Sequence, residues 1–246
     1  MEPWKTEIAY SSETETLIRG YDLESLIKNR TFTEMIYLIL KGELPSKSQT
    51  TVMNAMLVAA AEHGIAPPSA TSARMVASGG AAFNASVAAG ILALGDYHGG
   101  AIEGCAKLLQ ESQDKSAEEI VEEFRSQGKR IPGFGHKIYS EDPRTVALIL
   151  LAKKEKILGK CVKKALEIEK ELEKATGKKL CLNIDGIIAA LLSDMDFDWR
   201  LSNGFFVIAR APGLVAHVYE EKTKEKPFRR LEEGKDYEYV GKKKRD

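Results

Sequence analysis

Signals for the start and the end of helices recur along this chain and constrain its fold more than any other feature. Thr31 and Glu34 have the spacing of a capping box ahead of an apolar run, and Gly42 follows that run as a helix terminator. Helical spacing and start signals predict further helices over residues 50–63, 85–94, 116–126, 143–153 and 162–175. The pattern therefore predicts an all-α fold.

Some segments carry more specific expectations. Residues 85–94 are rich in small side chains and apolar nearly all round, which predicts a buried helix packed closely between others. Extended chain is expected only at residues 180–184 and 237–240. His217 lies in an apolar, helix-like run and is expected to belong to the core.

Composition limits the class of protein. The 246 residues are 43% hydrophobic, which suits one large domain or two unequal ones. Because 36 basic residues balance 36 acidic ones, no global field would attract nucleic acid or an anionic membrane. The basic segment 242–245 is expected to be a solvated tail.

The expected compartment is the cytoplasm. The first residues lack an apolar run of the signal-peptide type, and no segment reaches the roughly 18 apolar residues of a membrane span. The three cysteines, Cys105, Cys161 and Cys181, form neither a metal-binding pair nor an even disulfide framework. We expect them to be buried as small apolar residues, and we expect no metal site.

The stretch Gly133–Phe134–Gly135–His136–Lys137–Ile138–Tyr139–Ser140–Glu141–Asp142–Pro143–Arg144 is the strongest functional signal. Its two glycines permit backbone angles and close ligand approach that other residues forbid. The histidine between that hinge and the following helix can exchange a proton near neutral pH. This end of the stretch has the layout of an acid–base site.

The other end of the stretch predicts an anion site. Asp142 is a good N-cap and Pro143 suits the first helical position, so Arg144 falls in the first turn of a helix. There its guanidinium can grip a carboxylate with two hydrogen bonds.

Three of the four histidines lie at glycine junctions: His63, His98 and His136. Taken singly, each is more simply explained as a structural histidine. Together with Asp185 and several arginines, they form a candidate set for general acid–base catalysis.

These motifs resemble the citrate synthase superfamily along nearly the whole chain. The segments that carry the resemblance are 18–21, 32–34, 42–45, His63 with 72–74, the His98–Gly99–Gly100–Ala101 motif, the stretch 133–144, Asn183–Ile184–Asp185, and Ala209–Arg210 with 213–217. Segments 182–186 and 202–206 are most similar to citryl-CoA lyases and to the carboxy-terminal module of ATP-citrate lyases. His98 is a departure from some ATP-citrate lyases, which carry an aromatic residue there.

The resemblance implies a fold and an activity. It implies a large helical domain of residues 1–103 and 201–246 and a smaller inserted helical domain of residues 104–200. It also implies reversible, aldol-type cleavage of citryl-CoA to acetyl-CoA and oxaloacetate. A citrate or 2-methylcitrate synthase and a non-catalytic acyl-CoA-binding subunit stay open as alternatives.

The resemblance also implies roles for individual residues. In cleavage, His136 would accept the hydroxyl proton, His98 would hydrogen-bond the thioester oxygen, and Asp185 would protonate the released carbon. Carboxylates would be bound by His63, Arg144, Arg210 and an arginine of a neighbouring subunit, Arg229 or alternatively Arg230. Coenzyme A would lie against Ile131, Pro132, Gly133, Phe134 and Gly135.

Assembly and cofactors follow from the same resemblance. An arginine supplied by a neighbour implies a homodimer or a higher homo-oligomer. No tightly bound cofactor is expected, because coenzyme A enters as part of the substrate or product. A separate citryl-CoA synthetase is a possible partner.

Overall fold

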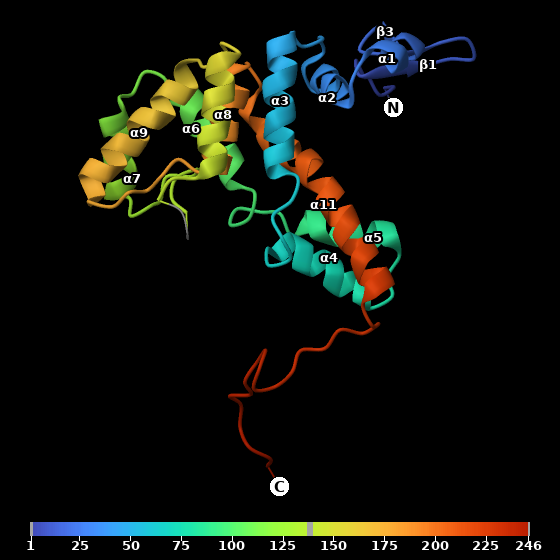
Figure 1. The fold of residues 1–246 in the computed structure, drawn as a ribbon, viewed down its shortest axis with the longest axis vertical. Helices are drawn as coiled ribbons and strands as arrows, with labels where there is room; N and C mark the ends of the chain where they lie inside the picture. The colour runs from blue at the N-terminus through green and yellow to red at the C-terminus, as the bar shows by residue number, and fades with distance from the viewer. Residues whose placement is uncertain (1, 137–139, 246) are drawn as a thin grey trace. The chain divides into compact units, whose positions relative to one another are not determined.

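The computed structural model describes residues 2–136 and 140–245, so Lys137, Ile138 and Tyr139 of the glycine-rich stretch lie outside the described residues. Helices dominate the chain, as the sequence predicts (Figure 1). They are α1 (Leu23–Asn29), α2 (Phe32–Lys41), α3 (Lys47–Ala60), α4 (Pro68–Ser78), α5 (Phe83–Leu92), α6 (Ala101–Glu111), α7 (Ala117–Ser126), α8 (Pro143–Lys154), α9 (Lys160–Thr176), α10 (Ile184–Asp194), the short 3₁₀ helix η1 (Trp199–Leu201) and α11 (Ser202–Lys224).

Local capping explains where several helices begin. Thr31 and Glu34 form both bonds of a capping box before α2, and Gly42 ends that helix with a φ of 87°. Ser116 caps α7 and Asp142 caps α8, so the helices expected at 116–126 and 143–153 are confirmed to within one residue. Helix α9 confirms the one expected at 162–175 and extends it at both ends.

The helix expected at 50–63 has the wrong bounds. A second capping box, between Ser46 and Gln49, starts α3 at Lys47. The helix ends at Ala60, so His63 lies beyond it in irregular chain.

A small antiparallel sheet was not expected. Strands β1 (Ala9–Ser11), β2 (Thr16–Ile18) and β3 (Tyr21–Asp22) pair in sequence order. Arg19 and Gly20 both have positive φ and turn the chain between β2 and β3. Strands of two or three residues are too short to produce a readable alternation of polar and apolar positions.

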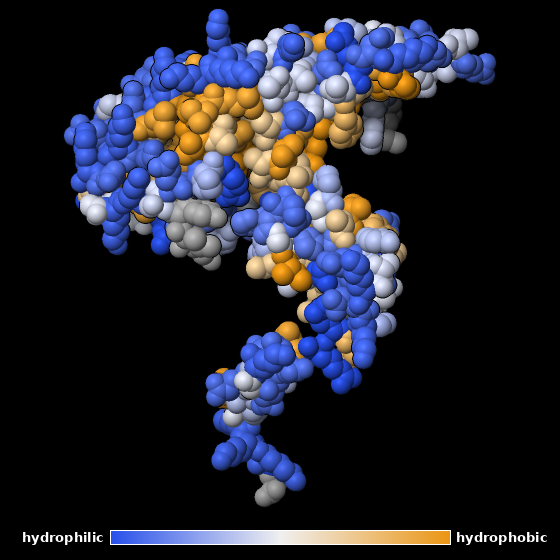
Figure 2. Space-filling model, in the orientation of Figure 1, coloured by the Kyte–Doolittle hydropathy of each residue, from blue (hydrophilic) through white to orange (hydrophobic). Residues whose placement is uncertain are grey.

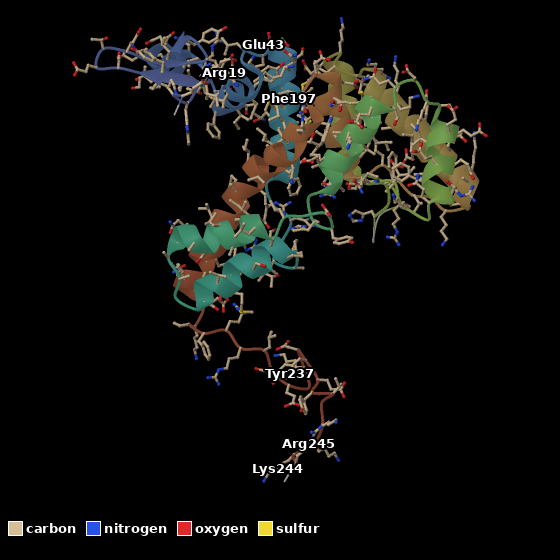
Figure 3. The ribbon with its side chains drawn as sticks, turned by 180° about the vertical axis from the view of Figure 1, so that it is seen from behind. Arg19, Glu43, Phe197, Tyr237, Lys244 and Arg245 are labelled. Carbon is tan, nitrogen blue, oxygen red and sulfur yellow. The ribbon has the colours of Figure 1, made fainter. Side chains whose placement is uncertain are left out.

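The two predicted extended segments differ in outcome. Of residues 180–184, Leu182 pairs with Phe134 in an isolated antiparallel bridge and Asn183 is extended, but Ile184 already belongs to α10. The strand expected at 237–240 is wrong, because Tyr237 makes only a single bridge, to Glu233, within a turn. Figure 3 labels Tyr237, Lys244 and Arg245 along this irregular C-terminal segment.

The chain divides into two compact units. Unit 1 comprises Met1–Ala61 and Gly99–Arg210, and unit 2 comprises Glu62–His98 and Ala211–Asp246. The division into domains 1–103 with 201–246 and 104–200 stays a prediction.

Helix α10 is the centre of unit 1. Its residues Gly186–Ser193 are all buried, and it packs against α6, α9 and α8.

Other residues of unit 1 add to its core and surface. The rings of Tyr37 and Phe197 meet edge to face, with their centroids 5.2 Å apart; Phe197 is labelled in Figure 3. The three cysteines are buried, as expected. Leu150 on α8 is exposed, and Figure 2 shows a hydrophobic area over this part of the surface.

In unit 2, α4 and α5 pack on the C-terminal part of α11 around Ala73, Ala77, Leu214 and Val218. The helix expected at residues 85–94 is α5, which spans Phe83–Leu92, and the expectation that it is buried is wrong. Only Ser86 and Gly90 of α5 are buried, and Leu92 is 83% exposed in the isolated chain. An apolar composition therefore does not by itself bury this helix.

In the part of the chain that the structure describes, no helix is long and apolar enough to cross a membrane.

Candidate functional site

The start of α8 holds an arginine in a fixed orientation. The buried carboxylate of Asp142 accepts hydrogen bonds from the backbone N–H of Arg144 at 3.0 Å, from its Nε at 3.0 Å and from its Nη2 at 2.8 Å. Burial alone would raise the pKa of Asp142, but these bonds and the arginine charge lower it below its usual value. Arg144 thus makes a two-bond contact with the carboxylate of Asp142, and its binding of a substrate carboxylate stays a prediction.

The start of α10 holds Asp185 in a different environment. Asn183 caps the helix by accepting hydrogen bonds from the backbone N–H groups of Asp185 and Gly186. Asp185 is half-buried, and burial raises its pKa above the usual value, although the charges of Arg144 and Arg210 oppose that shift. A carboxyl group with a raised pKa at an accessible position is suited to exchanging a proton.

Arg210 is buried and not a surface residue. Its Nε donates to the backbone oxygen of Ala60 at 2.9 Å, and its guanidinium lies 5.1 Å from the ring centroid of Phe206. His136 also acts on the charge balance of Asp185 and lowers its pKa slightly. Unit 1 thus brings together four of the predicted site residues: His136, Arg144, Asp185 and Arg210.

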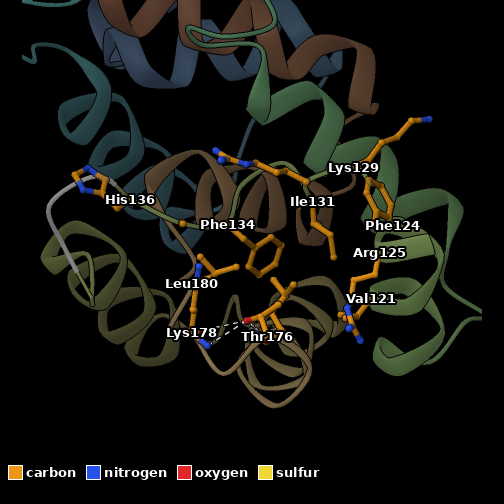
Figure 4. A pocket seen from close by; sticks show the side chains of 13 residues that line it. Val121, Phe124, Arg125, Lys129, Ile131, Phe134, His136, Thr176, Lys178 and Leu180 are labelled. Carbon is orange, nitrogen blue, oxygen red and sulfur yellow. Dashed lines mark hydrogen bonds between the residues drawn. The ribbon is translucent and has the colours of Figure 1, made fainter. Parts of the chain in front are cut away.

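A cavity of about 620 Å³ adjoins this cluster, with His136 at its edge (Figure 4). Ile131, Phe134 and Gly135, three residues of the segment predicted to bind coenzyme A, line it. The other two residues of that segment face elsewhere. Pro132 packs toward Gly104, and Gly133 lies against Cys105 and Gly186.

Sequence reasoning missed the basic residues of this cavity. Four basic side chains line it: Arg125, Lys129, Arg130 and Lys178. Phe124, Val121, Leu172 and Leu180 add apolar surface. The pair Lys129–Arg130 stands directly before the segment 131–135, and this position is the signal that could have identified it. Apolar walls with a basic rim suit a ligand that carries both a flat apolar group and phosphates.

Unit 2 contains the other predicted histidines. His98 is half-buried, and its Nε2 lies 2.8 Å from the Oγ of the fully buried Ser69. His63 is exposed and follows Glu62, whose carboxylate accepts from the backbone N–H of Gly64. The expectation that His217 is a core residue is wrong, because it is half-buried and bonds Glu62 through Nε2 at 3.0 Å.

Arg229 is engaged within its own chain. Its Nε and Nη2 donate to the buried carboxylate of Glu221, and Glu225 lies 3.3 Å away. Arg74 donates to the same carboxylate of Glu221 at 2.7 Å. The neighbouring Arg230 stacks its guanidinium over Phe228 at 4.7 Å.

Among residues 2–136 and 140–245, no three or more His, Cys, Asp or Glu side chains gather as a metal site would require. The absence of a metal cofactor stays a prediction.

Three relationships to known proteins bear on these observations. The solved structure of citryl-CoA lyase from Hydrogenobacter thermophilus is 51% identical, with a TM-score of 0.95, and the match covers 100% of this chain and 97% of that one. The solved structure of ATP citrate lyase from Methanothrix soehngenii, in complex with citrate and coenzyme A, is 25% identical with a TM-score of 0.85 over 99% of this chain and 43% of that one. ATP-citrate synthase beta chain protein 1 of Oryza sativa subsp. japonica is 30% identical over 212 residues, which are 78% of this chain and 34% of that protein.

The chain thus spans about a third of the length of the curated relatives it matches. Its helical architecture is that of the citrate synthase fold. The family model described as "Citrate synthase, C-terminal domain" matches residues 2–53 and 46–231. The chain belongs to the citrate synthase family.

Proposed function

We propose that this chain is a citryl-CoA lyase, which cleaves citryl-CoA to acetyl-CoA and oxaloacetate in a reversible aldol-type reaction. The observation that carries the proposal is the environment of Asp185. This half-buried carboxyl group has a pKa raised by burial, and it lies near the charges of Arg144, Arg210 and His136. The identity of 51% along the whole chain with a citryl-CoA lyase supports it.

The chemistry needs three groups. A base takes the hydroxyl proton as the carbon–carbon bond breaks, a hydrogen-bond donor stabilises the enolate of the thioester, and an acid protonates the enolate carbon. We assign these roles to His136, His98 and Asp185 in that order. A raised pKa keeps Asp185 protonated at a higher pH than an ordinary aspartate, which suits the acid in the cleavage direction.

The surroundings of the two histidines fit their assigned roles. The hydrogen bond between His98 Nε2 and Ser69 Oγ orients the imidazole ring, and a pre-oriented donor stabilises an enolate oxygen with little reorganisation. His136 follows Gly135, which has a φ of 89°, so the histidine is placed by a backbone turn that favours glycine.

Arginines and His63 would bind the carboxylates of the substrate. Arg144 is pre-oriented by Asp142, whose carboxylate accepts from its Nε and Nη2. Arg210 is buried, so a charge–charge contact with a carboxylate would be little screened. A neighbouring subunit would contribute Arg229, for which the Glu221 bonds must be exchanged, or alternatively Arg230.

Coenzyme A would occupy the cavity beside His136. The apolar side chains of Ile131 and Phe134 suit the adenine ring, and Lys129, Arg130 and Lys178 suit phosphates (Figure 4). The segment 131–135 would thus connect the coenzyme A pocket to the catalytic histidine.

We extend the proposal to the setting of the reaction. The enzyme would act as a homodimer or higher homo-oligomer in the cytoplasm, with no tightly bound cofactor. A separate citryl-CoA synthetase would supply the substrate. The residue division 1–103 with 201–246 and 104–200 would describe its large and small domains.

The direct test is an assay of the purified chain with synthetic citryl-CoA, following oxaloacetate, acetyl-CoA, free coenzyme A and citrate together. We expect oxaloacetate and acetyl-CoA in equal amounts. Citrate and free coenzyme A would instead indicate a hydrolysing citrate synthase, and binding without turnover would indicate a non-catalytic subunit.

The coenzyme A pocket has its own test. Because a phosphate contact is a charge-assisted bond, we expect Arg130→Ala to weaken coenzyme A binding about 10-fold, and less at high salt. Lys170→Ala, which removes an exposed lysine of α9 outside the cavity, is the matched control. Equal effects of the two substitutions would contradict the assignment.

A further inference from the structure

Two backbone segments carry His136 and Asp185, and they are bonded to each other. The backbone N–H of Gly135 donates to the oxygen of Cys181 at 2.7 Å, and the N–H of Asn183 donates to the oxygen of Gly133 at 3.0 Å. This pair of bonds forms the isolated bridge between Phe134 and Leu182. The glycine loop before His136 is therefore paired with the chain that leads into α10.

Packing between the same two segments is too close for any side chain. A Cβ on Gly186 would lie 2.4 Å from the oxygen of Gly133. A Cβ on Gly133 would lie 2.8 Å from both the Cα of Gly186 and the Sγ of Cys105. Gly133 also has a φ of 86°, which favours glycine. The two segments are thus in close backbone contact, with no room for a side chain at Gly133 or Gly186.

The side chain of Asn183 adds a third link, because it bonds the backbone beside both candidate catalytic residues. Its Oδ1 accepts from the backbone N–H of Asp185 at 3.0 Å and of Gly186 at 3.1 Å. Its Nδ2 donates to the oxygen of Gly135 at 2.9 Å. That oxygen belongs to the peptide group whose nitrogen is the backbone nitrogen of His136. One amide group therefore holds the peptide planes next to both residues.

The chemistry of the amide explains why asparagine stands at this position. A cap needs only an acceptor, and the other side-chain caps of the described helices are Asp, Ser or Thr. Aspartate could cap α10 but could not donate to a carbonyl oxygen, and serine is one atom shorter. Asparagine both accepts and donates across the span between the two segments.

We propose that Asn183 is a positioning residue that holds His136 and Asp185 in register for catalysis. Its cap sets the first turn of α10, and its amide donor sets the peptide plane that leads into His136. The inference deepens the proposed function and rests on it for the kinetic part of its test.

The kinetic test compares Asn183→Ser, which keeps a capping oxygen and loses the amide donor, with wild type. We expect kcat for citryl-CoA to fall about 10- to 100-fold, because a misplacement of about 1 Å costs that order of rate. The KM should rise by a smaller factor than kcat falls, because Gly135 lines the coenzyme A cavity but the basic residues of the cavity and the arginines are not substituted. A kcat within twofold of wild type would overturn the proposal, as would a rise in KM alone.

The matched control is Ser46→Ala, which removes the side-chain cap of α3. It should lower the melting temperature at least as much as Asn183→Ser and leave kcat unchanged. If Asn183→Ser does not fold, Asn183→Asp replaces it, because the carboxylate retains the cap and loses the same donor.

Hydrogen exchange separates a failure of this inference from a failure of the proposed function. If wild type does not turn over citryl-CoA, the proposed function fails and the positioning role is judged by exchange alone. In Asn183→Ser, the peptide covering 131–136 should exchange at least about 10-fold faster, because the Gly135 N–H bond to Cys181 loses its support, while α3 should not change. Unchanged exchange at 131–136 would overturn the inference even in an active enzyme.

Discussion

The starts of α8 and α10 each carry an aspartate that interacts with Arg144, and their pKa values move in opposite directions. Asp142 accepts direct hydrogen bonds from Arg144, and these outweigh burial and lower its pKa. Asp185 experiences Arg144 only as a nearby charge among the causes of its shift, and burial prevails and raises its pKa. The same residue type thus has a lowered pKa at one helix start and a raised pKa at the other.

The largest effect is expected from substituting Asp185. Asp185→Asn keeps the shape of the side chain and removes the carboxyl group that can act as an acid or base. Because a positioned acid–base group contributes about 100- to 10,000-fold, we expect kcat for citryl-CoA to fall by that factor. Steady-state assays with synthetic citryl-CoA measure it, and a residual rate above about a tenth of wild type would remove Asp185 from the acid role.

The next largest effect is expected from substituting Asp142. Asp142→Asn retains a cap but loses the charge that orients Arg144, so we expect kcat to fall about 10-fold and the stability to fall by about 1.5–3 kcal/mol. Thermal melting and kinetics check both. The difference in stability between wild type and variant should shrink at low pH. It should begin to shrink below about 3.9, the ordinary pKa of aspartate, and continue to shrink as pH falls through the lowered pKa of folded Asp142, because protonation then removes the ion pair from wild type too.

The chain offers a matched control for that substitution. Asp198 accepts from the backbone N–H, Nε and Nη2 of Arg200 in the same two-residue arrangement, and both side chains are exposed. Because exposed pairs are screened by solvent, Asp198→Asn should change the melting temperature much less. An equal fall in melting temperature in both variants would show that the aspartate–arginine hydrogen bonds stabilise the protein whether or not they are buried.

The sequence alone predicted the parts of this arrangement that depend on local chemistry. The capping box of Thr31 and Glu34, the Asp142–Pro143 start of α8 and the extended chain before α10 each depend on neighbouring residues. Local rules of this kind can be read from single residues and their spacing. They also placed Arg144 correctly in the first turn.

The rest depends on contacts between residues far apart in the chain. Arg74 pairs with Glu221, His98 pairs with Ser69, and Arg125 and Lys178 line the same cavity. No periodicity encodes such pairs. The mistaken burial of 85–94 has the same origin, because an apolar helix is buried only where another element covers it.

Substitution of Arg144 sharpens the contrast between the two aspartates. Arg144→Lys keeps the positive charge and loses the two-bond fork, so the pKa of Asp142 should rise while that of Asp185 changes little. Arg144→Met removes the charge as well, and both pKa values should rise. Titration of ¹³C-labelled aspartate carboxyls by NMR measures this, and a parallel response of both residues to lysine would contradict the distinction between bonding and charge.

The smallest expected effect concerns stability, and it has the opposite sign at the two aspartates. Because the pKa of Asp185 is raised in the folded state, its ionised form opposes folding, and the stability present below the unfolded value is lost as pH rises through the folded pKa. A neutral asparagine avoids that loss. Asp185→Asn should therefore melt higher than wild type at pH 7–8, by roughly 2–4 °C for each kcal/mol gained, and the gain should shrink toward pH 4. Melting curves of both proteins across this range would reveal it. A variant that melts lower at every pH would mean that the Asp185 carboxylate stabilises the fold, as the Asp142 carboxylate does. The two aspartates would then not differ in their effect on stability, and the contrast between the two helix starts would fail.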